Sequence, residues 1–206
     1  MNTISLNEAI RQGKVKIGDY IEYHPMIGTC VLTEKQTGWH KEQVFKTEQL
    51  KWRVDKINEY IILIADKPTT TEVFLAGKIA YGNGVTSINQ LCKQLYLDPA
   101  IAYKAICITA SIQENMSECN IRNMNKYWLG NFSMYGSDYN WDTWLALGCI
   151  CYGKCYAYAY VYSNSKKCSN SLGVRPVVYL NPNIQIMEDK DCDGSEEKPW
   201  KLLKVV

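Results

Sequence analysis

The chain has 206 residues and a formal net charge of +2, and 47% of its residues are hydrophobic. This length suits one domain with a substantial core. The near-neutral charge argues against nucleic acid as the main partner, because phosphate contacts need a basic face, and no apolar run approaches the ~20 residues of a membrane-spanning helix.

The first part of the chain predicts a short helix, a strand and a β-hairpin. Ser5 can cap a helix that Gly13 would end. Residues 15–25 follow as a strand, and residues 26–48 are polar and irregular, which predicts a long loop. In residues 50–68 apolar and charged side chains alternate before a turn and a buried strand, so we expect a hairpin.

The middle of the chain predicts a helix, and the end predicts short strands. YGNGV (81–85) is typical of a turn, and residues 86–99 carry apolar side chains at helical spacing. The remaining elements are expected in this order: a strand at 105–109, a short helix at 111–119, a strand at 173–180, an acidic turn at 189–199 and a strand at 200–206. Because helices come early and short strands late, we expect an α+β domain.

The composition changes between residues 127 and 170, which hold eight tyrosines and three tryptophans among Gly, Ser, Asn and Cys. In CYAYAYVYS (155–163) four tyrosines alternate with alanine and valine, so a strand would place all four on one face. A buried tyrosine row would need a partner for each hydroxyl, whereas the alanine and valine face can pack without any.

We therefore expect the tyrosines to face solvent in a recognition surface, because aromatic rings among small polar residues are typical of binding surfaces. The alternative is an aromatic-rich surface without a binding role. The expected binding residues are Tyr135, Tyr139, Trp141, Trp144, Tyr152, Tyr156, Tyr158, Tyr160 and Tyr162.

Several segments, taken in order, resemble a known domain. They are KIGDYIEYHP, LKWRVDKINEYIILIADKPT followed by YGNGV and INQLC, and WLALG followed by LGVRPVVYL and DGSEEKPW. This order resembles an uncharacterised domain of Firmicute genomes and prophages, which we associate with the formylglycine-generating-enzyme-like branch of the C-type lectin fold. Its relatives include sugar binders, formylglycine-generating oxidases and variable receptor-binding proteins of phages.

The resemblance implies one C-type-lectin-like domain over residues 1–206. Small twisted antiparallel sheets, two or three short helices and long irregular loops are expected. Residues 1–126 would form the scaffold, residues 127–170 the aromatic-rich recognition region, and residues 171–206 the closing strands.

The chain has nine cysteines, and without a secretion signal reduced thiols are expected. Cys149, Cys151, Cys155 and Cys168 lack the C-x2-C spacing of zinc sites, and no histidine lies near them in the sequence. We expect them to be metal-free. The resemblance implies one alternative, a small metal-dependent oxidase with Cys151 and Cys155 as copper ligands.

The acidic turn raises the question of calcium. Asp189, Asp191 and Asp193 precede Gly194 as in the first half of an EF-hand loop, but Trp200 stands where the closing bidentate acid is needed. We expect an ordinary acidic turn and no cofactor; a calcium site is the alternative.

Catalytic patterns are sparse, which favours a non-catalytic protein. The histidines are His24 and His40, and the chain has no phosphate loop or nucleophile elbow. Arg175, between apolar neighbours, is expected to be a structural partner in the sheet.

The leading hypothesis is a binding module for a protein or a glycan, encoded by a phage or prophage and serving in receptor binding or host interaction. Besides the oxidase, the alternative is a structural virion component. The start, MNTISLNEAIRQGK, lacks the apolar segment of a signal peptide, so we expect a cytoplasmic or virion-associated protein.

Overall fold

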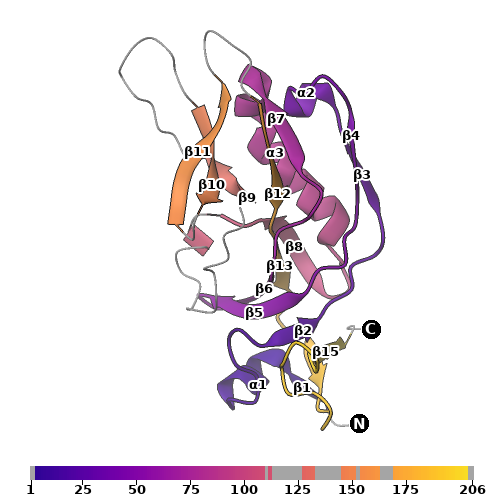
Figure 1. The fold of residues 1–206 in the computed structure, drawn as a ribbon. Coiled ribbons are helices and arrows are strands. Elements are labelled where there is room, and N and C mark those ends of the chain that lie inside the picture. Colours follow the sequence, from indigo (N-terminus) through magenta and orange to yellow (C-terminus); the bar gives the residue numbers. More distant parts are fainter. Residues whose placement is uncertain are drawn as a thin grey trace.

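The computed structural model describes residues 3–109, 111–112, 127–132, 145–151, 154–162 and 169–203. Over these residues the chain is an α+β structure with mostly strands and three helices, which confirms the expected fold class. The strands form an eight-stranded sheet, a five-stranded sheet and a two-stranded sheet (Figure 1). None of the described helices has the length and hydropathy to cross a membrane.

The helices are α1 (Leu6–Arg11), α2 (Glu34–Thr37) and α3 (Gly77–Tyr96). The strands, in chain order, are β1 (Thr3–Ser5), β2 (Tyr20–Glu22), β3 (Thr29–Leu32), β4 (Gln43–Lys46), β5 (Trp52–Ile57), β6 (Tyr60–Ala65), β7 (Val73–Ala76), β8 (Ala102–Cys107), β9 (Tyr127–Phe132), β10 (Leu145–Cys151), β11 (Lys154–Tyr162), β12 (Ser169–Val174), β13 (Pro176–Leu180), β14 (Gln185–Met187) and β15 (Trp200–Leu203).

The eight-stranded sheet has the order β1-β14-β15-β2-β5-β6-β13-β8, and all its pairs are antiparallel except β15 with β2. The hairpin predicted at 50–68 is confirmed as β5 and β6. Its turn contains Asn58 with φ of 54°, a left-handed conformation that asparagine tolerates well. The predicted N-terminal helix is also confirmed, and the Ser5 hydroxyl accepts a hydrogen bond from the Glu8 N–H at 3.2 Å.

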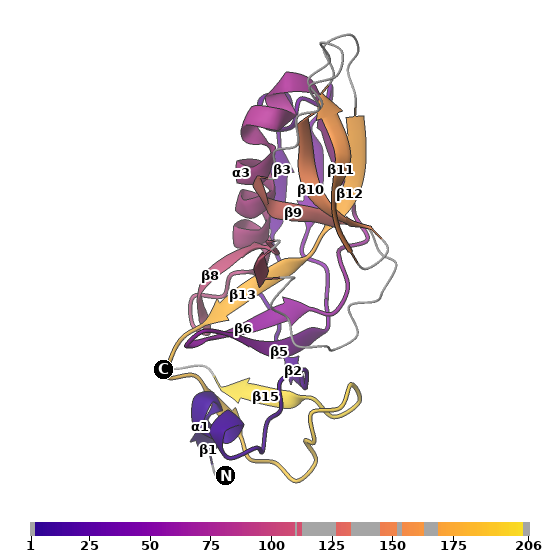
Figure 2. The same ribbon diagram turned by 90° about the vertical axis from the view of Figure 1, so that its left-hand side faces the viewer.

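One continuous segment joins the two large sheets. β12 belongs to the five-stranded sheet, of order β11-β10-β9-β12-β7, and β13 belongs to the eight-stranded sheet (Figure 2). Arg175 lies between them and is 6% exposed. Its guanidinium donates to the Ala65 carbonyl at 2.8 Å, the Asp66 carbonyl at 3.2 Å and the Tyr127 hydroxyl at 3.2 Å. Arg175 therefore has the structural role that the sequence predicted.

The long helix α3 packs its apolar face against the core. Ile88, Leu91, Cys92 and Leu95 are buried, as the spacing predicted. However, α3 has 20 residues, so the expectation of short helices fails here, and the turn predicted at 81–85 is wrong because these residues are helical. Burial of the helix face by tertiary contacts outweighs the helix penalty of about 1 kcal/mol for each glycine.

The long loop predicted at 26–48 is also wrong. These residues contain β3, α2 and β4, and β3 pairs antiparallel with β4. The Gln43 side chain attaches this small sheet to the edge of β7: its amide donates to the Phe74 carbonyl and accepts from the Phe74 N–H, both at 2.8 Å. Further along, the Glu48 carboxylate accepts hydrogen bonds from the backbone N–H groups of Thr70 and Thr71, each at 2.8 Å.

Two segments that carry the sequence resemblance contact each other directly. The indole N–H of Trp200 donates to the Asp19 carboxylate at 3.0 Å, and the Tyr20 N–H donates to the Gly194 carbonyl at 2.8 Å. Gly194 has a φ of +79°, and an added Cβ would lie 2.5 Å from the Asp19 carboxylate. The KIGDY and DGSEEKPW motifs therefore stabilise the junction of β2 with β15.

Candidate functional site

The predicted recognition residues fall into two groups. Those outside the described residues are Tyr135, Tyr139, Trp141, Trp144 and Tyr152. Tyr156, Tyr158, Tyr160 and Tyr162 lie on β11, at one end of the strand order of the five-stranded sheet. This confirms that CYAYAYVY is a strand.

The register of β11 bears on the expectation of one shared tyrosine face. The pairing of β11 with β10 shifts twice, between Leu145 and Ala146 and between Leu147 and Cys149. Each shift adds one extra residue on β11. An extra residue changes which face of the sheet the following side chains point to, so these shifts bear on whether all four tyrosines share one face. The side chains of β11 are outside the described part, so solvent exposure of the tyrosine row stays a prediction.

The candidate copper ligands also lie on these strands. Cys151 ends β10 opposite Lys154, and Cys155 on β11 lies opposite Ile150, so the two cysteines are diagonal neighbours in the ladder. Their side chains are not described. Among the residues whose side chains are described, no group of three or more His, Cys, Asp or Glu residues could hold a metal ion.

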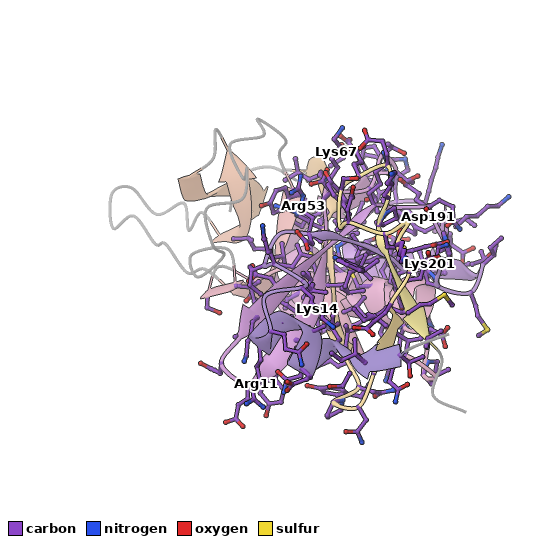
Figure 3. The ribbon with its side chains drawn as sticks, turned by 90° about the horizontal axis from the view of Figure 1, so that it is seen from below. Arg11, Lys14, Arg53, Lys67, Asp191 and Lys201 are labelled. Carbon is purple, nitrogen blue, oxygen red and sulfur yellow. The ribbon has the colours of Figure 1, made fainter. Side chains whose placement is uncertain are left out.

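The acidic turn uses its carboxylates to stabilise its own backbone. Asp189 accepts a hydrogen bond from the Asp191 N–H at 3.1 Å, and Asp193 accepts one from the Ser195 N–H at 2.9 Å. Asp189 also lies 3.8 Å from the Lys201 ammonium. Asp191 and Lys201 lie near each other on one side of this end of the molecule (Figure 3). The arrangement is an acidic turn with Asx-type hydrogen bonds, as expected from its sequence.

Three of the described thiols are poor nucleophiles. Cys30, Cys92, Cys107 and Cys192 are buried free cysteines. Burial raises the pKa of the Cys30 thiol, and burial together with a hydrogen bond that the Cys92 thiol donates to Cys107 raises the pKa of Cys92. Burial also raises the pKa of Cys192, although Lys201 opposes this shift. These three thiols are therefore protonated at neutral pH, the unreactive form.

The histidines occupy separate environments. His24 Nε2 lies 2.8 Å from a carboxylate oxygen of Glu22, and the ring of His40 packs on Trp39 with centroids 4.4 Å apart. Neither ring hydrogen-bonds a thiol in the part of the chain that the structure describes.

A cluster of three exposed or half-buried tyrosines lies near the β8 edge of the eight-stranded sheet. It consists of Tyr60 on β6, Tyr103 on β8 and Tyr179 on β13, hereafter the tyrosine cluster. The ring centroids are 6.5 Å apart for Tyr60 and Tyr103, 6.3 Å for Tyr60 and Tyr179, and 6.0 Å for Tyr103 and Tyr179. Tyr60 is 51% exposed and Tyr103 is 47% exposed, whereas Tyr179 is half-buried and packs against a small core around Ile62 and Val177.

A β-bulge exposes Tyr103 and its neighbour together. Tyr179 pairs with Lys104 and Leu180 pairs with Ala102, so Tyr103 is an extra residue on β8. Because a bulge interrupts the alternation of a strand, both Tyr103 and Lys104 are exposed. The Lys104 ammonium lies 4.8 Å from the Tyr179 ring centroid, within the range of a cation–π contact.

Tyr103 and Tyr179 present neutral phenols at neutral pH. Burial raises the pKa of the Tyr103 hydroxyl, and the nearby Tyr60 and Tyr179 hydroxyls raise it further. Burial also raises the pKa of Tyr179. Both groups can therefore donate and accept hydrogen bonds at the edge of an apolar ring surface, next to the Lys104 cation.

The sequence did not reveal the tyrosine cluster. Its members come from three strands, and their contact depends on the β6–β13–β8 pairing and on the bulge at Tyr103. Tyr103 lies before the strand predicted at 105–109, so no local pattern indicated that it is exposed beside Tyr60 and Tyr179.

Comparisons with protein families, with curated proteins and with solved structures found no match to this chain.

Proposed function

We propose that the protein is a non-catalytic binding module that contacts a protein or a glycan through exposed tyrosines. The observation that carries this proposal is the tyrosine cluster, in which Tyr60 and Tyr103 are about half exposed although their rings are large and apolar. Exposed aromatic groups of this kind often mark contact surfaces, because their burial by a partner removes apolar area from water.

The geometry of the cluster suits recognition. The rings stand at interplanar angles of 57° to 65°, so they present both faces and edges to solvent. Tyr179 packs against the small core below it, and each of the three rings lies beside the other two. Such mutually supported rings lose little conformational freedom on binding, which is one reason that tyrosine is common in binding surfaces.

The tyrosines of β11 would extend or complement this surface. A C-type-lectin-like arrangement of the chain, with the region 127–170 as a second recognition element, is part of the same proposal. In its concrete form the protein is encoded by a phage or prophage and contacts a host surface component. The near-neutral overall charge and the exposed tyrosines support a protein or glycan partner over nucleic acid.

Binding to intact Firmicute cells and to a glycan array tests this proposal. The fluorescently labelled wild type is compared with a Tyr60→Ala/Tyr103→Ala variant. A Met26→Ala/Ile27→Ala variant is the matched control, because these residues are 69% and 83% exposed but lie outside the cluster. Loss of two aromatic anchors should lower the affinity by about 2 kcal/mol or more, which is roughly thirtyfold.

The control variant should bind as the wild type does. If the tyrosine variant also binds as the wild type does, the cluster is not the contact surface. If the wild type binds neither the cells nor any arrayed glycan, nor any protein extracted from the cell surface, the binding function itself is contradicted.

A further inference from the structure

A small pocket lies where β2, β14 and β15 meet the turn before β8. Its volume is about 260 Å³, and it is lined by Glu22, His24, Ile101, Met187, Lys201 and Leu202. This size is just below the ~300–1,000 Å³ of sites for drug-sized ligands, so the pocket suits a small molecule. It shares no lining residue with the tyrosine cluster.

The inner wall of the pocket is apolar. Ile101 is 5% exposed and belongs to the main core, and Leu202 packs against that core. Met187 adds a flexible thioether side chain that can adapt to different apolar shapes. An aliphatic group placed here would be removed from water against these side chains, which favours its binding.

The rim of the pocket carries opposite charges that do not pair with each other. Glu22 and Lys201 are register partners in the parallel pair of β2 and β15. Opposite charges at neighbouring positions of two strands attract each other. Here the Glu22 carboxylate is bound to His24 at 2.8 Å, and the Lys201 ammonium lies 3.8 Å from Asp189. The pocket therefore has a carboxylate and an ammonium on its rim, each held by a different partner.

These charges select among ligand classes. A simple anion would meet Lys201, but Glu22 and Asp189 would repel it. A simple amine would meet Glu22, but Lys201 would repel it. A molecule that carries an ammonium and a carboxylate on the same carbon can contact Glu22 and Lys201 at once, and each contact is a charge-assisted hydrogen bond.

We propose that this pocket binds a small zwitterion with an aliphatic side chain, that is, an aliphatic α-amino acid. Its ammonium contacts Glu22, its carboxylate contacts Lys201, and its side chain packs against Ile101, Met187 and Leu202. This site is separate from the tyrosine cluster and does not depend on the function proposed for that cluster.

The test is an NMR titration of the ¹⁵N-labelled protein with three related ligands. L-leucine carries both charges, leucinamide lacks the carboxylate, and 4-methylpentanoate lacks the ammonium. Leucine should shift the amide signals of β2 and β15 in a saturable way. Leucine should bind at least about tenfold more tightly than either analogue. Leucinamide loses the contact with Lys201 but is still repelled by it, and 4-methylpentanoate loses the contact with Glu22 but is still repelled by it.

Two variants then assign the contacts. Lys201→Met should weaken leucine binding by about tenfold and leave leucinamide binding no weaker, whereas Glu22→Gln should weaken leucine binding and leave 4-methylpentanoate binding no weaker. Lys198→Met, which changes an exposed lysine outside the pocket, should leave leucine binding unchanged.

Several results would overturn the proposal. One is the absence of saturable leucine shifts around the pocket of the wild type. Another is equal affinity of the wild type for all three ligands. A third is an equal loss of leucine and leucinamide binding in Lys201→Met. The wild-type ligand series decides the question even if a variant does not fold.

Discussion

Replacing Gly194 with alanine should destabilise the protein by about 2.5–5 kcal/mol. Gly194 has a φ of +79°, and a left-handed conformation costs a non-glycine residue roughly 1–2 kcal/mol. The new Cβ would also lie 2.5 Å from the Asp19 carboxylate and 2.7 Å from Trp200 Nε1, too close for the present packing. Relieving this clash breaks the hydrogen bond between Trp200 and Asp19, and a hydrogen bond to a charged group contributes about 1.5–3 kcal/mol.

Gly13→Ala is the matched control for this substitution. Gly13 has a φ of +72°, but an added Cβ there would meet no atom within 4 Å. Gly13→Ala should therefore lower the free energy of unfolding only by the cost of the left-handed backbone conformation, roughly 1–2 kcal/mol. The assay is urea unfolding of both variants and the wild type, followed by fluorescence and extrapolated to water. If Gly194→Ala costs no more than Gly13→Ala, the argument that Gly194 is required by the Asp19–Trp200 contact is refuted.

Three further predictions concern pH, a buried cation and calcium. Burial opposes ionisation of Glu48, but hydrogen bonds from residues 70–71 outweigh it and lower the pKa of the carboxyl. The ionised Glu48 carboxylate therefore stabilises the protein above its unfolded pKa of about 4.5, and this stabilisation is lost as the pH falls through the lower pKa of the folded state. Glu48→Gln should therefore reduce the fall in melting temperature that acid causes. Arg175→Met removes buried hydrogen bonds and should lower the free energy of urea unfolding by about 3–5 kcal/mol, a loss that Gln in its place should partly restore. Millimolar calcium should leave the melting temperature unchanged, because Asp189 and Asp193 already accept backbone hydrogen bonds; a rise that magnesium does not reproduce would contradict this.

The elements that the sequence predicted correctly have strong local signals. The β5–β6 hairpin combines alternation, a turn and a run of apolar residues, and all residues from Ile61 to Ala65 are buried. The α1 helix has Ser5 as a hydrogen-bonding cap, and Gly13 follows it with a positive φ. In these segments local preference and tertiary packing favour the same structure, so the sequence alone is enough to find them.

The wrong predictions occur where tertiary contacts override local preference. The glycines at 82 and 84 disfavour a helix, yet α3 runs through them because its buried face contacts the core. Residues 26–48 look like a loop because their strands are only four residues each, and the Gln43 contact with Phe74 attaches them to a distant strand.

The candidate site was the least predictable part of the protein. The sequence pointed to tyrosines close together in the chain, on β11. The tyrosine cluster instead unites Tyr60, Tyr103 and Tyr179, which are far apart in the sequence and meet only through strand order. The bulge that exposes Tyr103 beside Lys104 depends on the pairing of β8 with β13, and no local pattern indicates it.

The central claim is that the tyrosine cluster serves contact with a partner and is not required for folding. Urea unfolding of the Tyr60→Ala/Tyr103→Ala variant beside the wild type tests this most directly. Because both rings are about half exposed, their loss should remove mainly ring–ring contacts, and we predict a decrease in unfolding free energy below about 2 kcal/mol. A decrease of about 3–5 kcal/mol for each ring, as for buried aromatic residues, would show that the cluster is part of the core and would contradict the account.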